Sequence, residues 1–181
     1  MSLDPLDAAL VATAALEGAS IPCAIGGALA LGVWGVPRAT LDVDLNVFVD
    51  GERLDRAIDV LVAAGLAIET EAARAAAAAD GWFSAKLSGI RVDVFVPSIP
   101  FSYEAARTRR LVCLEGRDVP FLSMEALAVF KMLFFRPKDL IDLERLLALQ
   151  PDLDRRYVRA HLVDMVGETD ARIPRWDELT G

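Results

Sequence analysis

Histidine and cysteine are scarce in this chain, which has one histidine and two cysteines among its 181 residues. His161, Cys23 and Cys113 are far apart, and none has another Cys or His at the spacing of metal ligands. Zinc binding and histidine-based catalysis are therefore not expected. We expect both cysteines to be buried as small apolar residues and His161 to lie on a helix surface.

The chain also lacks long apolar runs and a positive net charge. Charged residues interrupt the apolar ones, no run approaches the roughly 18 to 20 residues of a membrane span, and the amino terminus lacks the basic start of a signal peptide. We therefore expect a cytoplasmic protein with no membrane partner. The net charge of −8 opposes broad binding to nucleic-acid backbones, so any such contact would be local.

Hydrophobic residues make up 54% of the chain, which is enough for a packed core in one domain with a small appendage. Periodicity and glycine or proline signals predict alternating helices and strands in the first third. The expected elements are a helix at 3–18, a strand at 21–25, a helix at 28–34, a strand at 40–49 and a helix at 52–65.

The middle of the chain predicts shorter elements. Residues 66–70 are compatible with a short strand, and the alanine tract 72–79 with a helix or a surface connection. Glycine-separated segments within 82–96 predict a hairpin, followed by short strands at 111–115 and 119–122, and everything from Ser123 onward is typical of helices. The fold class is therefore α/β (α+β): a mixed β-sheet flanked by helices over residues 1–122, and a C-terminal helical segment over 123–181 that packs on it.

Three aspartates lie on predicted strands whose other face is apolar. Period-two geometry places Asp42 and Asp44 on one face of their strand, about 6.6 Å apart, from which both can reach two metal ions about 3.5–4 Å apart. Asp93 occupies the same kind of position on a later strand, and all three acids converge if the two strands pair. Uncompensated carboxylates would destabilise the fold, whereas Mg²⁺ prefers such oxygen ligands.

Gly26 and Gly27 supply an independent signal. A glycine turn between a strand and a helix exposes backbone N–H groups at the helix amino terminus, where anions bind. Each feature alone also has a plain structural interpretation, as a tight turn or as the solvent face of a half-exposed sheet. Together they describe an anion cradle opposite a metal–carboxylate cluster.

The order Gly26-Gly27, Asp42-x-Asp44 and a distant Asp93 resembles the DNA polymerase β-type nucleotidyltransferase superfamily. The segment "GGALALGVWGVPRATLDVDL" is similar to its small bacterial members, which include abortive-infection type toxins, minimal nucleotidyltransferases and antibiotic-modifying enzymes. The segment "FLSMEALAVFKMLFFRPKDLIDLERLL" resembles their helical part. The resemblance implies a nucleotidyltransferase-like catalytic core followed by helices.

The resemblance also implies an activity. A nucleoside monophosphate would pass from an NTP, such as ATP, to an acceptor hydroxyl on RNA, protein or a small molecule, with release of pyrophosphate. Asp42 and Asp44 would hold two Mg²⁺ or Mn²⁺ ions, while Asp93 would ligate the second ion and help take the hydroxyl proton.

The negative charge of an NTP requires basic side chains beside the metals. Gly26, Gly27, Arg38 and Lys131 are the candidate nucleotide-binding residues. Arg38 equally suits a loop surface, and Lys131 stands among apolar helix residues where a charge needs a partner. Asp139 and Asp142 resemble a family motif in which a lysine precedes a K-D-x-x-D-like stretch, but we prefer to interpret them as acids near a helix start that interact favourably with its dipole.

Two alternatives stay open from the sequence. One is a non-catalytic nucleotide-binding protein or a toxin–antitoxin interaction protein on the same scaffold; the presence of all three acids favours the enzyme. The other, a metal-dependent phosphohydrolase, has less support because no histidine or additional acid motif accompanies the aspartates. A homodimer and a cognate protein partner are both compatible with the chain.

Overall fold

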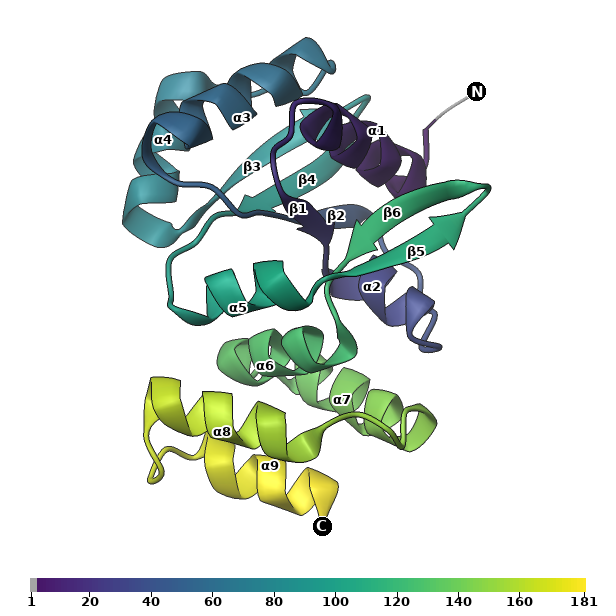
Figure 1. The fold of residues 1–181 in the computed structure, drawn as a ribbon, viewed down its shortest axis with the longest axis vertical. Helices are drawn as coiled ribbons and strands as arrows, with labels where there is room; N and C mark the ends of the chain where they lie inside the picture. The colour runs from purple at the N-terminus through teal and green to yellow at the C-terminus, as the bar shows by residue number, and fades with distance from the viewer. Residues whose placement is uncertain (1–2) are drawn as a thin grey trace.

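The computed structural model describes residues 3–181 and shows a mixed β-sheet followed by a group of C-terminal helices (Figure 1). In chain order, the helices of this range are α1 (Pro5–Gly18), α2 (Gly27–Val33), α3 (Gly51–Ala63), α4 (Thr70–Asp80), α5 (Phe101–Thr108), α6 (Met124–Phe134), α7 (Pro137–Leu149), α8 (Arg155–Val166) and α9 (Arg172–Thr180). The strands are β1 (Cys23–Ile25), β2 (Asp42–Val47), β3 (Trp82–Leu87), β4 (Ile90–Phe95), β5 (Arg110–Leu114) and β6 (Arg117–Phe121). None of the described helices is both long and apolar enough to cross a membrane.

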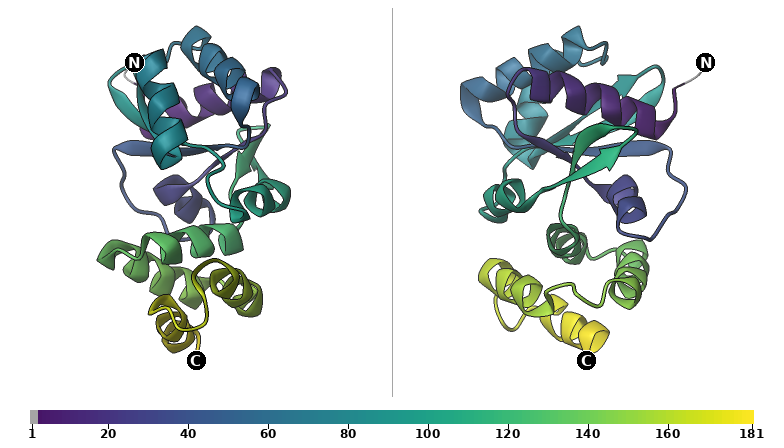
Figure 2. Two further views of the ribbon diagram at one scale, coloured as in Figure 1. Left: turned by 90° about the vertical axis from the view of Figure 1, so that its left-hand side faces the viewer. Right: turned by 45° about the vertical axis from the view of Figure 1, so that its right-hand side comes forward.

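The strands form one six-stranded sheet in the order β3-β4-β2-β1-β6-β5. Strand β2 runs parallel to β4 and β1 runs parallel to β6, whereas β1–β2, β3–β4 and β5–β6 are antiparallel pairs. The expected mixed sheet, with its hairpin within residues 82–96, is therefore confirmed. Helices α1 and α3 lie over one face, and α2, α5 and α6 lie on the other side (Figures 1 and 2).

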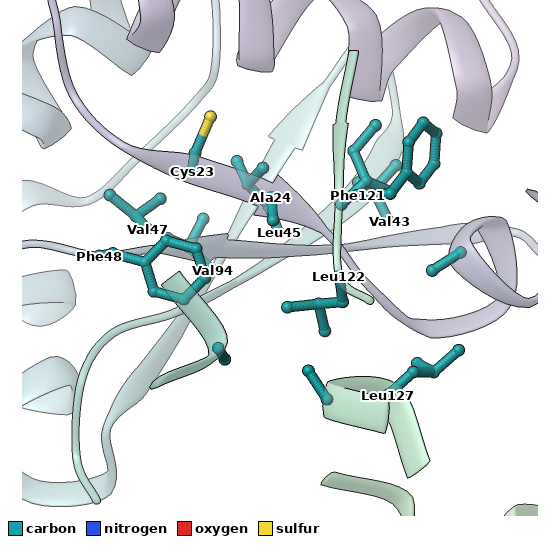
Figure 3. Packing of buried hydrophobic residues seen from close by; sticks show 14 of the residues in the cluster. Cys23, Ala24, Val43, Leu45, Val47, Phe48, Val94, Phe121, Leu122 and Leu127 are labelled. Carbon is teal, nitrogen blue, oxygen red and sulfur yellow. The ribbon is translucent and has the colours of Figure 1, made fainter. Parts of the chain in front are cut away.

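Apolar and polar side chains alternate along β2, and this gives the sheet an apolar face and a polar face. Val43, Leu45 and Val47 are fully buried and pack with residues of the neighbouring strands and α1 (Figure 3). Burial of each such side chain contributes roughly 1.5–3 kcal/mol. Asp42 and Asp44 alternate with these residues and therefore face the opposite side, toward α6 and α7.

Hydrogen bonds at Trp34, the residue that ends α2, connect α2 to the chain before α6 and to the end of α7. Trp34 Nε1 donates to the carbonyl oxygen of Leu122 at 2.9 Å, and Gln150 Nε2 donates to the carbonyl oxygen of Trp34 at 2.8 Å. Helix α6 also packs against α2. The expected boundary between 1–122 and 123–181 falls between β6 and α6, and its role as a division into two units stays a prediction.

The structure corrects several local expectations. Residues 66–70 form no strand, and only Ala67 makes an isolated bridge to β3. The alanine tract 72–79 belongs to α4, because Ala73 and Ala77 are one helical turn apart and both are buried. Helix α5 was not expected from the sequence at all.

The environments of the two cysteines and the histidine differ in part from those expected. Cys23 is buried as expected, and burial raises the pKa of its thiol to about 12, so the thiol stays protonated at neutral pH. Cys113 is exposed, because β5 is an edge strand. His161 does not lie freely on a helix surface: its ring centroid is 4.4 Å from that of Tyr157 and 4.9 Å from that of Phe101.

Candidate active site

The three candidate acids lie on one face of neighbouring parallel strands. Asp42 and Asp44 are on β2, Asp93 is on β4, and the strand register places Asp44 directly opposite Asp93. Arg91 stands opposite Asp42 in the same register. The pairing that the sequence left conditional is therefore present, and it brings the three carboxylate-bearing residues together.

Asp44 lies against the glycine turn. A Cβ atom on Gly27 would be 1.7 Å from Asp44 Oδ2, and Gly27 has a φ of +55°, a conformation that favours glycine. The backbone N–H of Gly26 donates to the carbonyl oxygen of Asp44 at 2.8 Å. Burial, together with the negative charges of Asp42 and Asp93, raises the pKa of Asp44. The glycines thus leave room for a carboxylate in a strongly negative environment.

The other two carboxylates have protein partners. Thr40 Oγ1 donates to Asp42 Oδ1 at 2.5 Å, and Arg91 Nε donates to Asp93 Oδ1 at 2.8 Å. Within residues 3–181, no three Asp, Glu, His or Cys side chains are already arranged as a set of metal ligands. The acids therefore share a face, and the second carboxylate oxygens of Asp42 and Asp93 are outside these two hydrogen bonds.

The candidate basic residues meet at one carboxylate of α7. Lys131 Nζ lies 2.7 Å from Asp142 Oδ2 and 3.4 Å from Asp139 Oδ1, and the Lys131 side chain is only 7% exposed. Arg38 Nε lies 3.4 Å from Asp142 Oδ1. The partner that a buried lysine requires is thus a pair of aspartates, and one of them, Asp142, also pairs with Arg38.

The interpretation of Asp139 and Asp142 as simple helix-dipole partners was incomplete: it describes the position of Asp139 but not the burial of either residue. Both are buried, and both form ion pairs with Lys131. Asp139 does stand in the first turn of α7, where its Oδ2 accepts from the backbone N–H of Arg136 at 3.2 Å and from Arg136 Nε at 2.6 Å. Burial raises the pKa of Asp139, but Arg136 and Lys131 outweigh this effect and hold it below its usual value.

A cleft of about 1140 Å³ separates the acid face of the sheet from α6 and the start of α7. Its acidic wall carries Asp42, Asp44 and Asp93, beside Gly27. Side chains from the loop before β2 and from the facing helices give it a basic wall: Arg38, Lys131, Arg136 and Lys138. Such a cleft suits a polyanion that carries divalent cations, because each wall is complementary to one part of that ligand.

Several residues that line the cleft were not predicted from the sequence: Arg91, Arg136, Lys138 and the aromatic residues. Arg91 stands two residues before Asp93, so strand alternation already places both on one face. Arg136 and Lys138 flank the proline that opens α7, and nothing in their local pattern indicates that they face the acids. Their position depends on how α7 packs.

Comparison with known proteins identifies the fold. No family model matches the sequence, and no curated protein matches it significantly. The crystal structure of ANT(2'')-Ia in complex with adenylyl-2''-tobramycin is similar at a TM-score of 0.58 and 19% identity, covering 88% of this chain and 96% of that one. The solution structure of the antibiotic-resistance factor ANT(2'')-Ia is similar at a TM-score of 0.60 and 18% identity, covering 90% of this chain and 92% of that one.

An antigenic nucleotidyltransferase-like protein from Paracoccidioides brasiliensis is similar at a TM-score of 0.51 and 20% identity. The alignment covers 97% of this chain and 94% of that protein. Each similarity extends over at least 88% of this chain. The chain therefore has the fold of the nucleotidyltransferases.

Proposed function

We propose that this protein transfers a nucleoside monophosphate from an NTP to an acceptor hydroxyl and releases pyrophosphate. One observation carries the proposal: Asp44 lies opposite Asp93 and against a side-chain-free Gly27, on the floor of a cleft whose other wall is basic. Glycines that serve only a tight turn, or aspartates that lie only on a solvated sheet face, would not need to lie together in such a cleft. The shared fold of the nucleotidyltransferases supports the same assignment.

Asp42, Asp44 and Asp93 are the residues that would hold two Mg²⁺ or Mn²⁺ ions. They fit such ions because they supply only hard oxygen ligands, and because Asp42 and Asp93 already disfavour the charged form of Asp44. Bound cations would supply charge neutralisation on the phosphates and a lower pKa for the acceptor hydroxyl. Gly27 provides the space in which the Asp44 carboxylate turns toward the phosphates.

The reaction requires one bond to form and one to break. The acceptor oxygen attacks the α-phosphorus, the bond from that phosphorus to the bridging oxygen breaks, and pyrophosphate leaves with its electron pair. Asp93 accepts the hydroxyl proton and returns it to water. Arg38, Lys131 and Arg136 face the acids across the cleft and would neutralise the triphosphate.

A thermal-shift titration tests the proposal. The protein is heated with each of the four NTPs, with Mg²⁺, Mn²⁺ or EDTA, beside the Asp42→Asn/Asp44→Asn double variant. At about 100 times Kd a ligand stabilises by about 2.7 kcal/mol, which raises Tm by roughly 5–10 °C for a chain of this size. Because the ANT(2'')-Ia complex contains an adenylyl group, ATP is tested first. Stabilisation by NTP that is equal in the double variant would contradict the metal assignment.

One observation favours a second candidate function, nucleotide binding without turnover. Asp93, the proposed base, is ion-paired with Arg91. A nucleotide sensor or a toxin–antitoxin protein would keep this pair while the cleft binds NTP. Such a protein would show the thermal shift but would release no pyrophosphate with any acceptor, and Arg91→Ala would not change that result.

A further inference from the structure

A second set of side chains shares the sheet face with the candidate acids. Strand β3 is the edge of the sheet next to β4, and its residues alternate between exposed and buried. Its exposed residues therefore extend the acid face outward, on the side away from Gly27. The cross-strand pairs on this part of the face are Trp82 with Phe95, Ser84 with Asp93, and Lys86 with Arg91.

The first pair is an aromatic surface that opens into the cleft. The rings of Trp82 and Phe95 are stacked at 6.2 Å between centroids with 28° between their planes, and Phe134 of α6 meets Phe95 edge-on at 6.1 Å. Trp82 is 36% exposed and Phe134 is 50% exposed, although both line the cleft. Exposed rings of this kind bind other planar rings by stacking.

The third pair is basic. Lys86 and Arg91 are both exposed and stand directly opposite each other on neighbouring strands. Like charges in this position destabilise a sheet, and Arg91 is also ion-paired with Asp93 at 2.8 Å. An anion beside Lys86 and Arg91 would relieve the repulsion.

Asp93 stands midway between the two pairs. Phe95 and Arg91 are each two residues from Asp93 along β4, a distance of about 6.6 Å at the backbone. A ring, a hydroxyl and an anionic group in this order, at such separations, are the parts of a nucleotide: its base, a ribose hydroxyl and its phosphate.

We propose that this part of the face, comprising Trp82, Phe95, Lys86 and Arg91, is the acceptor subsite and that the acceptor is a nucleotide. Its base stacks on the aromatic pair, its ribose hydroxyl lies at Asp93, and its phosphate lies at the basic pair. The inference rests on the proposed function, which supplies the reactive hydroxyl at Asp93. Two sources share this chemistry, the 3′ end of an RNA and a free nucleoside monophosphate.

Charge argues against a polycationic acceptor such as an aminoglycoside. Three of the five acids that line the cleft are the proposed metal ligands, and Asp139 is paired with Lys131 and Arg136. Among the described lining residues this leaves Asp80 for a cationic ligand. Arg91 stands at the acceptor side and would repel such a ligand.

Position argues against the alternative in which the aromatic pair holds the base of the NTP. Gly27 and Asp44, which face the phosphates in the proposed reaction, lie on the β1–β2 side of Asp93. Trp82 and Phe95 lie beyond Asp93, on the β3 side. In-line transfer requires the donor and the acceptor to approach from opposite sides of the α-phosphorus.

The test compares acceptor binding with NTP binding in the same variants. The probe is a short, 5′-labelled single-stranded RNA with a free 3′-hydroxyl, measured by fluorescence anisotropy at low salt with Mg²⁺, and AMP is the competitor. Trp82→Ala and Lys86→Ala should each weaken RNA binding about 10-fold, the usual effect of losing a stacked base or a phosphate contact. Trp82→Phe should retain most of the affinity. NTP-dependent thermal shifts should stay at the wild-type value in all three.

Control variants lie near the opposite edge of the sheet. Leu111→Ala removes an exposed apolar side chain from β5, and Arg117→Ala removes an exposed charge from β6; neither should change RNA binding. Displacement of the RNA by AMP would identify a free nucleotide as the acceptor, and resistance to AMP would identify an RNA end; both support the proposal.

Three results would overturn the acceptor assignment. In the first, neither the RNA nor AMP binds. In the second, tobramycin binds more tightly than both nucleotide probes. In the third, Trp82→Ala weakens NTP binding as much as it weakens RNA binding. The wild-type thermal shift with NTP and Mg²⁺ is a separate measurement, so the proposed function survives or fails independently of these results.

Discussion

Gly27 and Asp44 are so close that a single added methyl group would overlap the carboxylate, with a Cβ atom only 1.7 Å from Oδ2. A shift of strand β2 to relieve the overlap would strain the hydrogen bond from the Gly26 N–H to the Asp44 carbonyl oxygen. The side chain of Asp44 would have to rotate out of its present position. The glycine turn therefore determines where the Asp44 carboxylate can lie and is not only a connection.

Gly27→Ala should abolish the stabilisation by NTP and metal and should cost more than about 2 kcal/mol in the free energy of unfolding, since strain and overlap add. Gly116→Ala is the matched control: its φ is +79° and a Cβ there meets nothing within 4 Å. It should cost about 1 kcal/mol from backbone strain alone and leave the NTP shift intact. Equal effects of the two variants in urea unfolding and thermal shift would contradict the proposed role of Gly27.

Asp44→Asn should stabilise the protein without metal by about 1 kcal/mol, because it removes one of three like charges at a partly buried position. The variant should also lose the response to NTP and Mg²⁺. Urea unfolding in EDTA measures the first effect, with Asp118→Asn on β6 as an exposed control that should change little. A less stable Asp44→Asn variant would show that the carboxylate makes a structural contact instead.

The sheet and the face that carries its acids could be predicted from the sequence, because both follow from the alternation of apolar and polar residues along the strands. The period of two in β2 and β4 fixes which residues share a face, whatever the tertiary structure. The parallel pairing of Asp44 with Asp93 was only conditional, because β3 and the helices α3 and α4 intervene in the chain. Strand alternation identifies faces, but it does not identify neighbours.

The basic wall of the cleft was harder to predict from the sequence, for a related reason. Lys131 clearly needed a partner, but its partners lie eight and eleven residues away on another helix. Which acids it meets depends on the angle between α6 and α7, and local periodicity carries no information about that angle. Asp139 and Asp142 were therefore interpreted mainly from their position near the start of the helix.

Lys131→Met should lower the free energy of unfolding by up to about 3–5 kcal/mol, because the buried charges of Asp139 and Asp142 would lose the ammonium group and keep only the guanidinium groups of Arg136 and Arg38 as partners. Adding Asp142→Asn to this variant should recover part of the loss, since one of the stranded charges is then gone. Urea unfolding of the single and double variants gives the coupling free energy between Lys131 and Asp142. Additive losses in the double variant would mean that Lys131 and Asp142 do not stabilise each other.

Glu104 on α5 and Tyr157 on α8 connect the sheet region to the C-terminal helices. Tyr157 Oη donates to Glu104 Oε1 at 2.7 Å. Hydrogen bonds from Arg107 and Tyr157 lower the pKa of Glu104 from 4.5 to about 2. Because the folded-state pKa is depressed, the stabilisation by this carboxylate is complete above pH 4.5 and is lost as the pH falls toward 2.

Tyr157→Phe should therefore cost about 1.5–3 kcal/mol at pH 7, the usual value of a hydrogen bond to a charged group, and the cost should shrink below pH 4.5. Tyr103→Phe is the control, because its hydroxyl also donates to a carboxylate, Asp50, but at an exposed position where the bond contributes little. Urea unfolding of both variants between neutral and acidic pH measures the difference. A cost for Tyr157→Phe that does not change with pH would show that the hydroxyl stabilises α8 without the Glu104 charge, so that protonation of Glu104 would not loosen the contact between α5 and α8.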